Sequence, residues 1–99
     1  MNHRPAGRIE MFPATASWAM DEDGIRLHGR SAEGPLIALI TRAGLAALVG
    51  RDRCELSAGM AWALFERFSA RIMELIDREY AARPASSIRI DYAEVENVG

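Results

Sequence analysis

The sequence predicts an α+β protein of two layers, in which a small, mostly antiparallel sheet packs on one long helix. Three patterns predict this fold: a helical periodicity from about residue 58 to 82, short segments in which apolar and polar residues alternate, and turn signals between them. A short helix is expected at about 42–49, and the 99 residues are expected to form a single domain, 1–99. The sheet should have three or four strands, at about 16–20, 25–30, 36–40 and 87–92.

The first strands are expected to follow an irregular N-terminal arm and to form a hairpin. Residues 1–15 contain two prolines and no periodicity, with at most an extended piece around 9–12. Alternating segments then flank Asp23-Gly24, a pair typical of tight turns because glycine adopts positive φ without strain. The run 36–40 is apolar at every position, which favours a central strand covered on both faces.

The helix ends have recognisable signals. Thr41 and Ser57 precede the two helices and are predicted N-caps, because their hydroxyl oxygens accept hydrogen bonds from the first free backbone N–H groups. Gly50 is expected to end the short helix in the left-handed conformation, and Pro84 to end the long helix at the preceding residue. The chain should close with an acidic tail at 93–99.

The long helix has two apolar rows. Its core face spans an arc of about 120° and contains Ala61, Leu64, Phe65, Phe68, Ile72, Leu75 and Ile76. A second row holds Trp62, Met73 and Tyr80. A helix of about 39 Å would overhang strands of about 17–20 Å, so either the short helix with the arm or a second subunit must cover the rest. The second row is therefore a candidate interface for a homodimer or another protein partner, and Glu79 in the apolar arc should overhang the sheet or meet an arginine.

A row of basic residues suggests an alternative function. Arg26, His28 and Arg30 share one face of a predicted strand, and Arg89 would join them if the last strand is adjacent. Such a row could bind an anionic ligand or a nucleic acid through charge-assisted hydrogen bonds, although it is more often simply a solvated sheet face. The formal net charge is −2, whereas nucleic-acid-binding domains usually have a basic balance, so a nucleic-acid partner is not expected.

The remaining residues indicate no catalytic or metal chemistry. One cysteine, Cys54, excludes an internal disulfide and is typical of a reducing compartment, so a cytoplasmic location is expected. Two histidines and one cysteine lack the spacing of a zinc site, and neither a phosphate-binding glycine loop nor a nucleophile elbow is present. No apolar run is long enough for a membrane span. The sequence therefore predicts a non-catalytic protein–protein interaction or dimerisation module without a cofactor, metal or membrane partner.

Several motifs follow one another in a recognisable order. They are Ile25-Arg26-Leu27-His28-Gly29, the strand 36–40, Thr41 with Leu45, Phe65, Arg71-Ile72, Tyr80, Ser87-Ile88 and Ile90. This order resembles the bacterial domain of unknown function (DUF) 1488 family over about residues 10–96. Leu27 stands where that family often has phenylalanine, and Glu94 near where it often has aspartate. The resemblance implies a small α+β protein and transfers no catalytic residue.

Overall fold

The computed structural model describes residues 9–96 and confirms the α+β class. Its four strands lie in the order β1-β2-β3-β4; β2 is antiparallel to both β1 and β3, while β4 is parallel to β3. The strands are β1 (Ile9–Ala19), β2 (Gly24–Ser31), β3 (Gly34–Thr41) and β4 (Ser87–Ile90). The helices are α1 (Arg42–Ala47), α2 (Ala58–Arg67), α3 (Ser69–Ala82) and α4 (Tyr92–Glu96), with two 3₁₀ turns, η1 (Met20–Glu22) and η2 (Arg53–Glu55).

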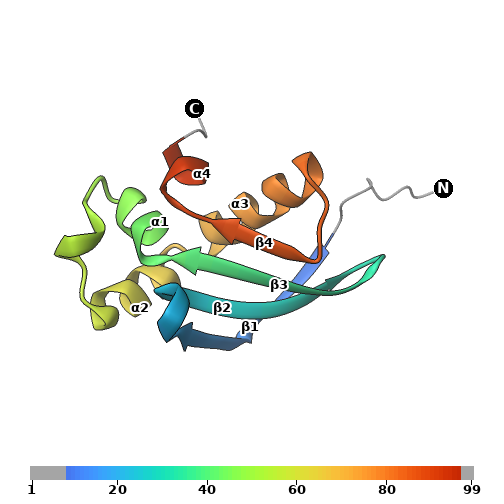
Figure 1. Ribbon diagram of the computed structural model, residues 1–99, viewed down its shortest axis with the longest axis horizontal. Helices are drawn as coiled ribbons and strands as arrows, with labels where there is room; N and C mark the ends of the chain where they lie inside the picture. The colour runs from blue at the N-terminus through green and yellow to red at the C-terminus, as the bar shows by residue number, and fades with distance from the viewer. Residues whose placement is uncertain (1–8, 97–99) are drawn as a thin grey trace.

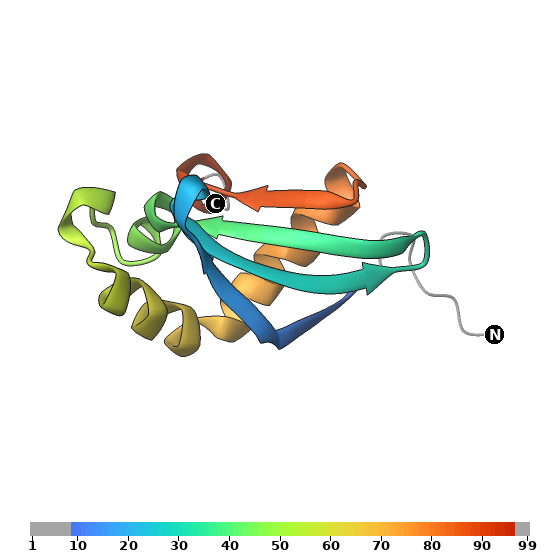
Figure 2. The same cartoon turned by 60° about the horizontal axis from the view of Figure 1, so that its bottom comes forward.

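The core lies between one face of the sheet and the helices behind it (Figures 1 and 2). Alternate residues of β2, β3 and β4 point into this core because strand side chains alternate between the two faces. The buried sheet residues are Ile25, Leu27, Leu36, Ala38, Ile40, Ile88 and Ile90, and the helices contribute Leu45, Ala61, Phe65, Ile72, Leu75, Ile76 and Tyr80. Within residues 9–96, every buried polar side-chain atom has a hydrogen-bond partner.

The predicted long helix is divided at Phe68. This residue has φ −105° and ψ 27°, outside the helical region, although the backbone bonds Phe68 N–H to Leu64 C=O and Ile72 N–H to Phe68 C=O continue across it. The chain therefore changes direction between α2 and α3 instead of running straight (Figure 2). Neither proline nor glycine lies at the break, so the usual sequence signals of a kink are missing.

The first strand is longer than predicted. Residues 9–15 belong to β1, where an irregular arm was expected; residues 1–8 lie outside the described residues. The ladder with β2 is interrupted between Phe12 and Ser17, and Pro13 lies in the interruption, where a missing N–H does no harm. The Thr15 hydroxyl donates to the Phe12 carbonyl at 2.7 Å and accepts from the His28 N–H at 2.8 Å, which replaces part of the lost ladder.

The hairpin turn uses Asp23 and Gly24 differently from the prediction. Asp23 adopts the left-handed conformation, with φ 54°, whereas Gly24 is already the first residue of β2. A Cβ atom at Gly24 would lie 2.5 Å from the Ile40 carbonyl oxygen and 2.8 Å from the Thr41 Cα. Glycine is therefore required here for the close approach of two strands, and the turn itself falls on the aspartate.

The helix ends agree with the predicted signals, and the C-terminal segment does not. Thr41 and Ser57 accept hydrogen bonds from the N–H groups of the third residue after each, and Gly50 has φ 69°. However, β4 ends at Ile90 and α4 follows, where the sequence predicted strand to residue 92 and then a tail over 93–99. Residues 97–99 lie outside the described part of the chain.

Candidate functional site

The sheet face opposite the core carries the predicted basic row. We call it the open sheet face, because none of the helices within residues 9–96 is drawn across it in Figure 1. From the strand registers, its side chains come from Glu10, Phe12, Ser17, Arg26, His28, Arg30, Pro35, Ile37, Leu39, Ser87 and Arg89. The expectation that β3 is covered on both faces is wrong, since Ile37 points to this face and is 38% exposed.

The strand register brings the four predicted basic residues together. Arg26 and Arg89 are both Cα partners of Leu39, so they lie on either side of it in one row across three strands. With strands about 4.8 Å apart, their Cα atoms are separated by about 10 Å. His28 and Arg30 follow at alternate positions along β2, and His28 is exposed beside Ile37.

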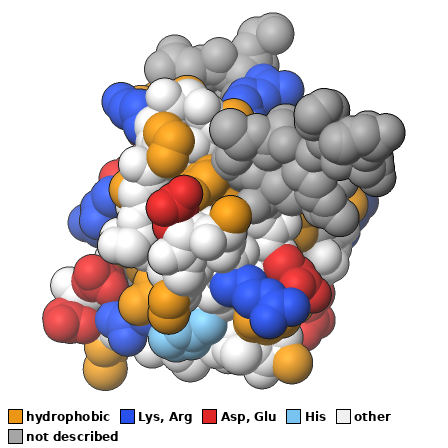
Figure 3. All heavy atoms as spheres, turned by 90° about the vertical axis from the view of Figure 1, so that its right-hand side faces the viewer, with side chains coloured by type: hydrophobic (Ala, Val, Ile, Leu, Met, Phe, Trp, Pro, Cys, Tyr) orange, Lys and Arg blue, Asp and Glu red, His pale blue; other side chains and the backbone are white. Residues whose placement is uncertain are grey.

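Each of the three arginines already has a carboxylate partner. Arg26 pairs with Glu22 at 2.9 Å, Arg30 with Glu10 at 3.1 Å and Arg89 with Asp91 at 3.2 Å. An incoming phosphate would have to displace these carboxylates, which makes the row a poor anion site. Acidic and basic side chains also lie next to each other on the side of the molecule shown in Figure 3.

The open sheet face also carries apolar side chains on β1 and β3, on either side of His28. Ile37 shares one row with His28 and Phe12, Leu39 lies two residues further along β3, and the Arg30 guanidinium packs over the Phe12 ring at 5.9 Å from its centroid. Leu39 is only 7% exposed although it is not part of the main core, so its neighbours on this face cover it. Apolar side chains beside polar ones are the usual composition of a protein–protein interface.

The predicted helical interface is largely covered within the chain. Tyr80 is 4% exposed and belongs to the core, while Trp62 and Met73 are half-buried and pack against it. The Trp62 ring meets Phe65 edge-on, with centroids 5.8 Å apart, and lines a hollow beside the β1 interruption. The three residues therefore do not form a continuous exposed surface, and Tyr80 is inaccessible to a partner. Glu79 pairs with Arg83, as the sequence predicted for a carboxylate in the apolar arc.

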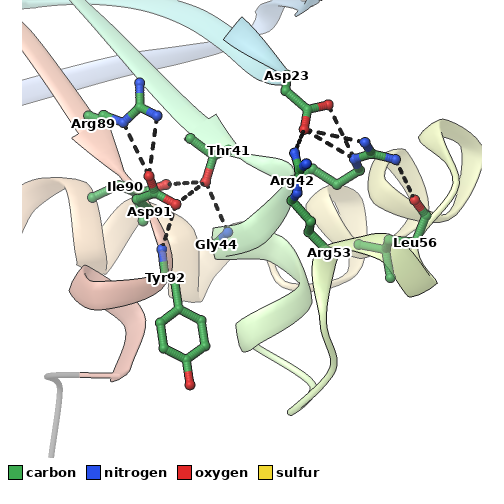
Figure 4. Close-up of polar contacts among 10 residues, drawn as sticks. All are labelled: Asp23, Thr41, Arg42, Gly44, Arg53, Leu56, Arg89, Ile90, Asp91 and Tyr92. Carbon is green, nitrogen blue, oxygen red and sulfur yellow. Dashed lines mark hydrogen bonds and ion pairs between the residues drawn. The ribbon is translucent and has the colours of Figure 1, made fainter.

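Two polar clusters fasten the end of the sheet to the helices (Figure 4). The Asp23 carboxylate accepts from Arg53 at 2.8 Å and pairs with Arg42 at 3.2 Å, and Arg42 also donates to the Leu56 carbonyl at 2.9 Å. These bonds hold the loop between α1 and α2 against the hairpin turn. In the second cluster, the Thr41 hydroxyl donates to Asp91 at 2.8 Å and accepts from the Gly44 N–H at 3.0 Å.

The Asp91 carboxyl has a pKa below its usual range. Partial burial acts to raise this pKa, but hydrogen bonds from the Tyr92 N–H, the Thr41 hydroxyl and the Arg89 guanidinium together outweigh it. Because the folded-state pKa is depressed, the resulting stability is present above the unfolded pKa of about 3.9 and is lost as pH falls through the folded value.

We expect Asp91→Asn to lower the free energy of unfolding at neutral pH by about 1 kcal/mol, since the carboxylate is partly solvated and asparagine still caps a helix. The difference from the parent protein should shrink as pH falls below about 4. Urea unfolding at a series of pH values measures this. Asp77→Asn, at an exposed site on α3 outside the cluster, is the control. A pH-independent difference for Asp91→Asn would contradict the role given to its charge.

No catalytic or metal-binding constellation is visible in residues 9–96. Cys54 is exposed in η2, which contacts the hairpin turn through the Arg53–Asp23 ion pair. His28 lies five residues along β2 from Asp23, which corresponds to about 16 Å. Among the described residues, no group of three or more His, Cys, Asp or Glu side chains is placed to hold a metal ion. None of the helices in that range has the length and apolarity needed to cross a membrane.

The apolar part of the open sheet face was missed by reasoning from the sequence. Phe12 lies in the segment expected to be irregular, and Ile37 and Leu39 lie in a run that is apolar on both sides. The available signal was the alternation of Arg26, His28 and Arg30: a strand with one polar face makes the same face of its neighbour accessible.

Comparison with known proteins supports the fold. No protein-family model and no curated protein matches this chain. Among solved structures, the chain is similar to the crystal structure of a protein of unknown function from the DUF1488 family of Shewanella loihica PV-4, with a TM-score of 0.69 and 15% sequence identity. The match covers 91% of this chain and 97% of the other. The family resemblance seen in the sequence motifs is thus confirmed at the level of the fold.

Proposed function

We propose that this protein is a non-catalytic protein–protein interaction module that forms a homodimer through its open sheet face. The observation that carries the proposal is Ile37, a large apolar side chain that is 38% exposed on this face, next to charge-balanced ion pairs. In the proposed dimer the two sheet faces would lie about 10 Å apart, the spacing of stacked sheets.

The size of the face suits a weak dimer. Four strands at about 4.8 Å give a width of about 19 Å, and eight residues at about 3.3 Å give a length of about 26 Å. Two such faces in contact would bury about 1,000 Å², the lower limit for a specific interface. The ion pairs of this face do not oppose self-association, because their three arginines and three carboxylates sum to zero charge.

We expect Ile37→Glu to abolish self-association and to leave the fold intact, since the side chain is already 38% exposed and removing a carboxylate from water in the dimer is costly. Val49→Glu is a matched control, because Val49 is 37% exposed in the segment that follows α1, away from the sheet face. Sedimentation equilibrium at micromolar concentrations measures both. A strictly monomeric parent protein, or an equal effect of the two substitutions, would refute the proposed dimer.

The same material tests the alternative of an anion-binding face. The protein is titrated with labelled single-stranded DNA at low salt, because electrostatic binding is strongest there. Because Arg26, Arg30 and Arg89 are already paired, we expect no saturable binding. Saturable binding that Arg26→Ala or Arg89→Ala abolishes would assign the open sheet face to an anionic ligand instead.

A further inference from the structure

A second apolar surface lies between α2 and the segment that follows α1. It is a groove of about 400 Å³ whose apolar lining comes from Val49, Leu56, Met60, Ala63 and Leu64. Val49 is 37% and Met60 46% exposed, while Leu56 is 2% exposed and forms the floor. An unbranched methionine side chain adapts to different apolar surfaces, which suits a binding groove more than a fixed core position.

One of the polar clusters of Figure 4 fixes the outer wall of the groove in position. Its outer wall is the segment 49–55, and at the end of this segment the carbonyl of the floor residue Leu56 accepts a hydrogen bond from Arg42 at 2.9 Å. In the same segment Arg53 pairs with Asp23 at 2.8 Å. A wall fixed in this way needs little ordering when a ligand binds, which lowers the entropic cost of association.

The charged side chains that line the groove are all positive. Its charged lining residues are Arg51 and Arg67, one on each wall, and no carboxylate lines it. Seven other arginines form ion pairs, but within residues 9–96 neither Arg51 nor Arg67 has a carboxylate at ion-pair distance. Arg67 instead packs its guanidinium over the Phe68 ring, 5.5 Å from the centroid. This surface therefore differs from the open sheet face, whose arginines are neutralised.

We propose that this groove binds an acidic amphipathic helix of a partner protein. The apolar side chains of such a helix, spaced at i, i+3/i+4 and i+7, would pack on Met60 and Val49, and flanking carboxylates would pair with Arg51 and Arg67. The occupant is acidic because it must supply the counter-charge that the groove lacks, and it is amphipathic because the groove is apolar between the two arginines. This site is separate from the proposed dimer face.

The test uses the full chain and three fluorescein-labelled synthetic peptides that share one pattern of leucines. Their flanking residues are glutamate, glutamine or lysine, and fluorescence anisotropy measures binding. We expect the glutamate peptide to bind at least about tenfold more tightly than the lysine peptide, since like charges across an interface are strongly disfavoured. Equal binding of all three peptides would mean nonspecific apolar contact and would overturn the proposal, as would failure of the glutamate peptide to bind.

Substitutions then locate the site. Both arginines are exposed, so the double variant Arg51→Glu/Arg67→Glu should fold. It should bind the lysine peptide more tightly than the glutamate peptide, a reversal of affinities that a loss of folding cannot produce. Arg71→Glu/Arg78→Glu changes the same charge on α3 outside the groove and should leave the order unchanged. Ile37→Glu, the dimer-face variant, should bind the glutamate peptide like the parent chain. An unchanged order in the groove variant would overturn the proposal.

Discussion

Replacing Gly24 by alanine is expected to lower the free energy of unfolding by about 3 kcal/mol, at the upper end of what overpacking costs. The added Cβ would meet the Ile40 carbonyl oxygen at 2.5 Å and the Thr41 Cα at 2.8 Å, and both are backbone atoms of the neighbouring strand. A flexible side chain could move aside, but here β3 itself must shift. That shift would also disturb Thr41, whose hydroxyl joins the sheet to α1 and Asp91.

The matched control for Gly24→Ala is Gly59→Ala in α2. A Cβ at Gly59 would approach nothing closer than the Ser57 hydroxyl oxygen at 4.0 Å, so alanine should stabilise the helix by about 0.5–1 kcal/mol. Urea unfolding followed by tryptophan fluorescence measures both variants. If Gly24→Ala were neutral, the two strands would not approach as closely as described.

Features that depend on neighbouring residues were predictable from the sequence. The N-caps at Thr41 and Ser57 follow from hydroxyl chemistry, and the helix end before Pro84 follows from the geometry of the preceding residue. The alternation of Arg26 and His28 with apolar residues located β2 and its polar face. The arginine row was likewise found by period alone, because side chains two residues apart share a face.

Features that depend on distant contacts were not predictable. The break at Phe68 has no local signal, and the length of β1 depends on pairing with β2 through Thr15 rather than on its own alternation. Asp23 rather than Gly24 takes the positive φ, and its carboxylate binds Arg42 and Arg53, which are distant in the sequence. The pairing of Arg30 with Glu10 likewise depends on the register of β1 with β2, whereas the other two carboxylates of the arginine row are near their partners in the sequence.

The predicted partner surface is less exposed than expected for a quantitative reason. It assumed a straight helix over strands of five or six residues, whereas β1 has 11 residues, β2 and β3 have eight each, and the helix bends. The longer sheet reaches the second apolar row. The β1 interruption lies beside Trp62, and Ser31, Pro35 and Pro84 lie beside Tyr80. An apolar helix flank therefore indicates a partner only when the length of the sheet is known.

Tyr80→Ala distinguishes the two readings of that flank. Tyr80 is a core residue with 4% exposure, so its truncation to alanine should lower the free energy of unfolding by about 3–4 kcal/mol. This is a large part of the about 5–15 kcal/mol that is typical of a domain. Tyr80→Phe keeps the ring in the core and should cost less than about 1 kcal/mol. Both variants should self-associate like the parent protein wherever they remain folded, which is the opposite of the result expected for Ile37→Glu. If Tyr80→Ala instead left the stability unchanged and dissociated the dimer, the helical flank would be the interface and the open sheet face would not.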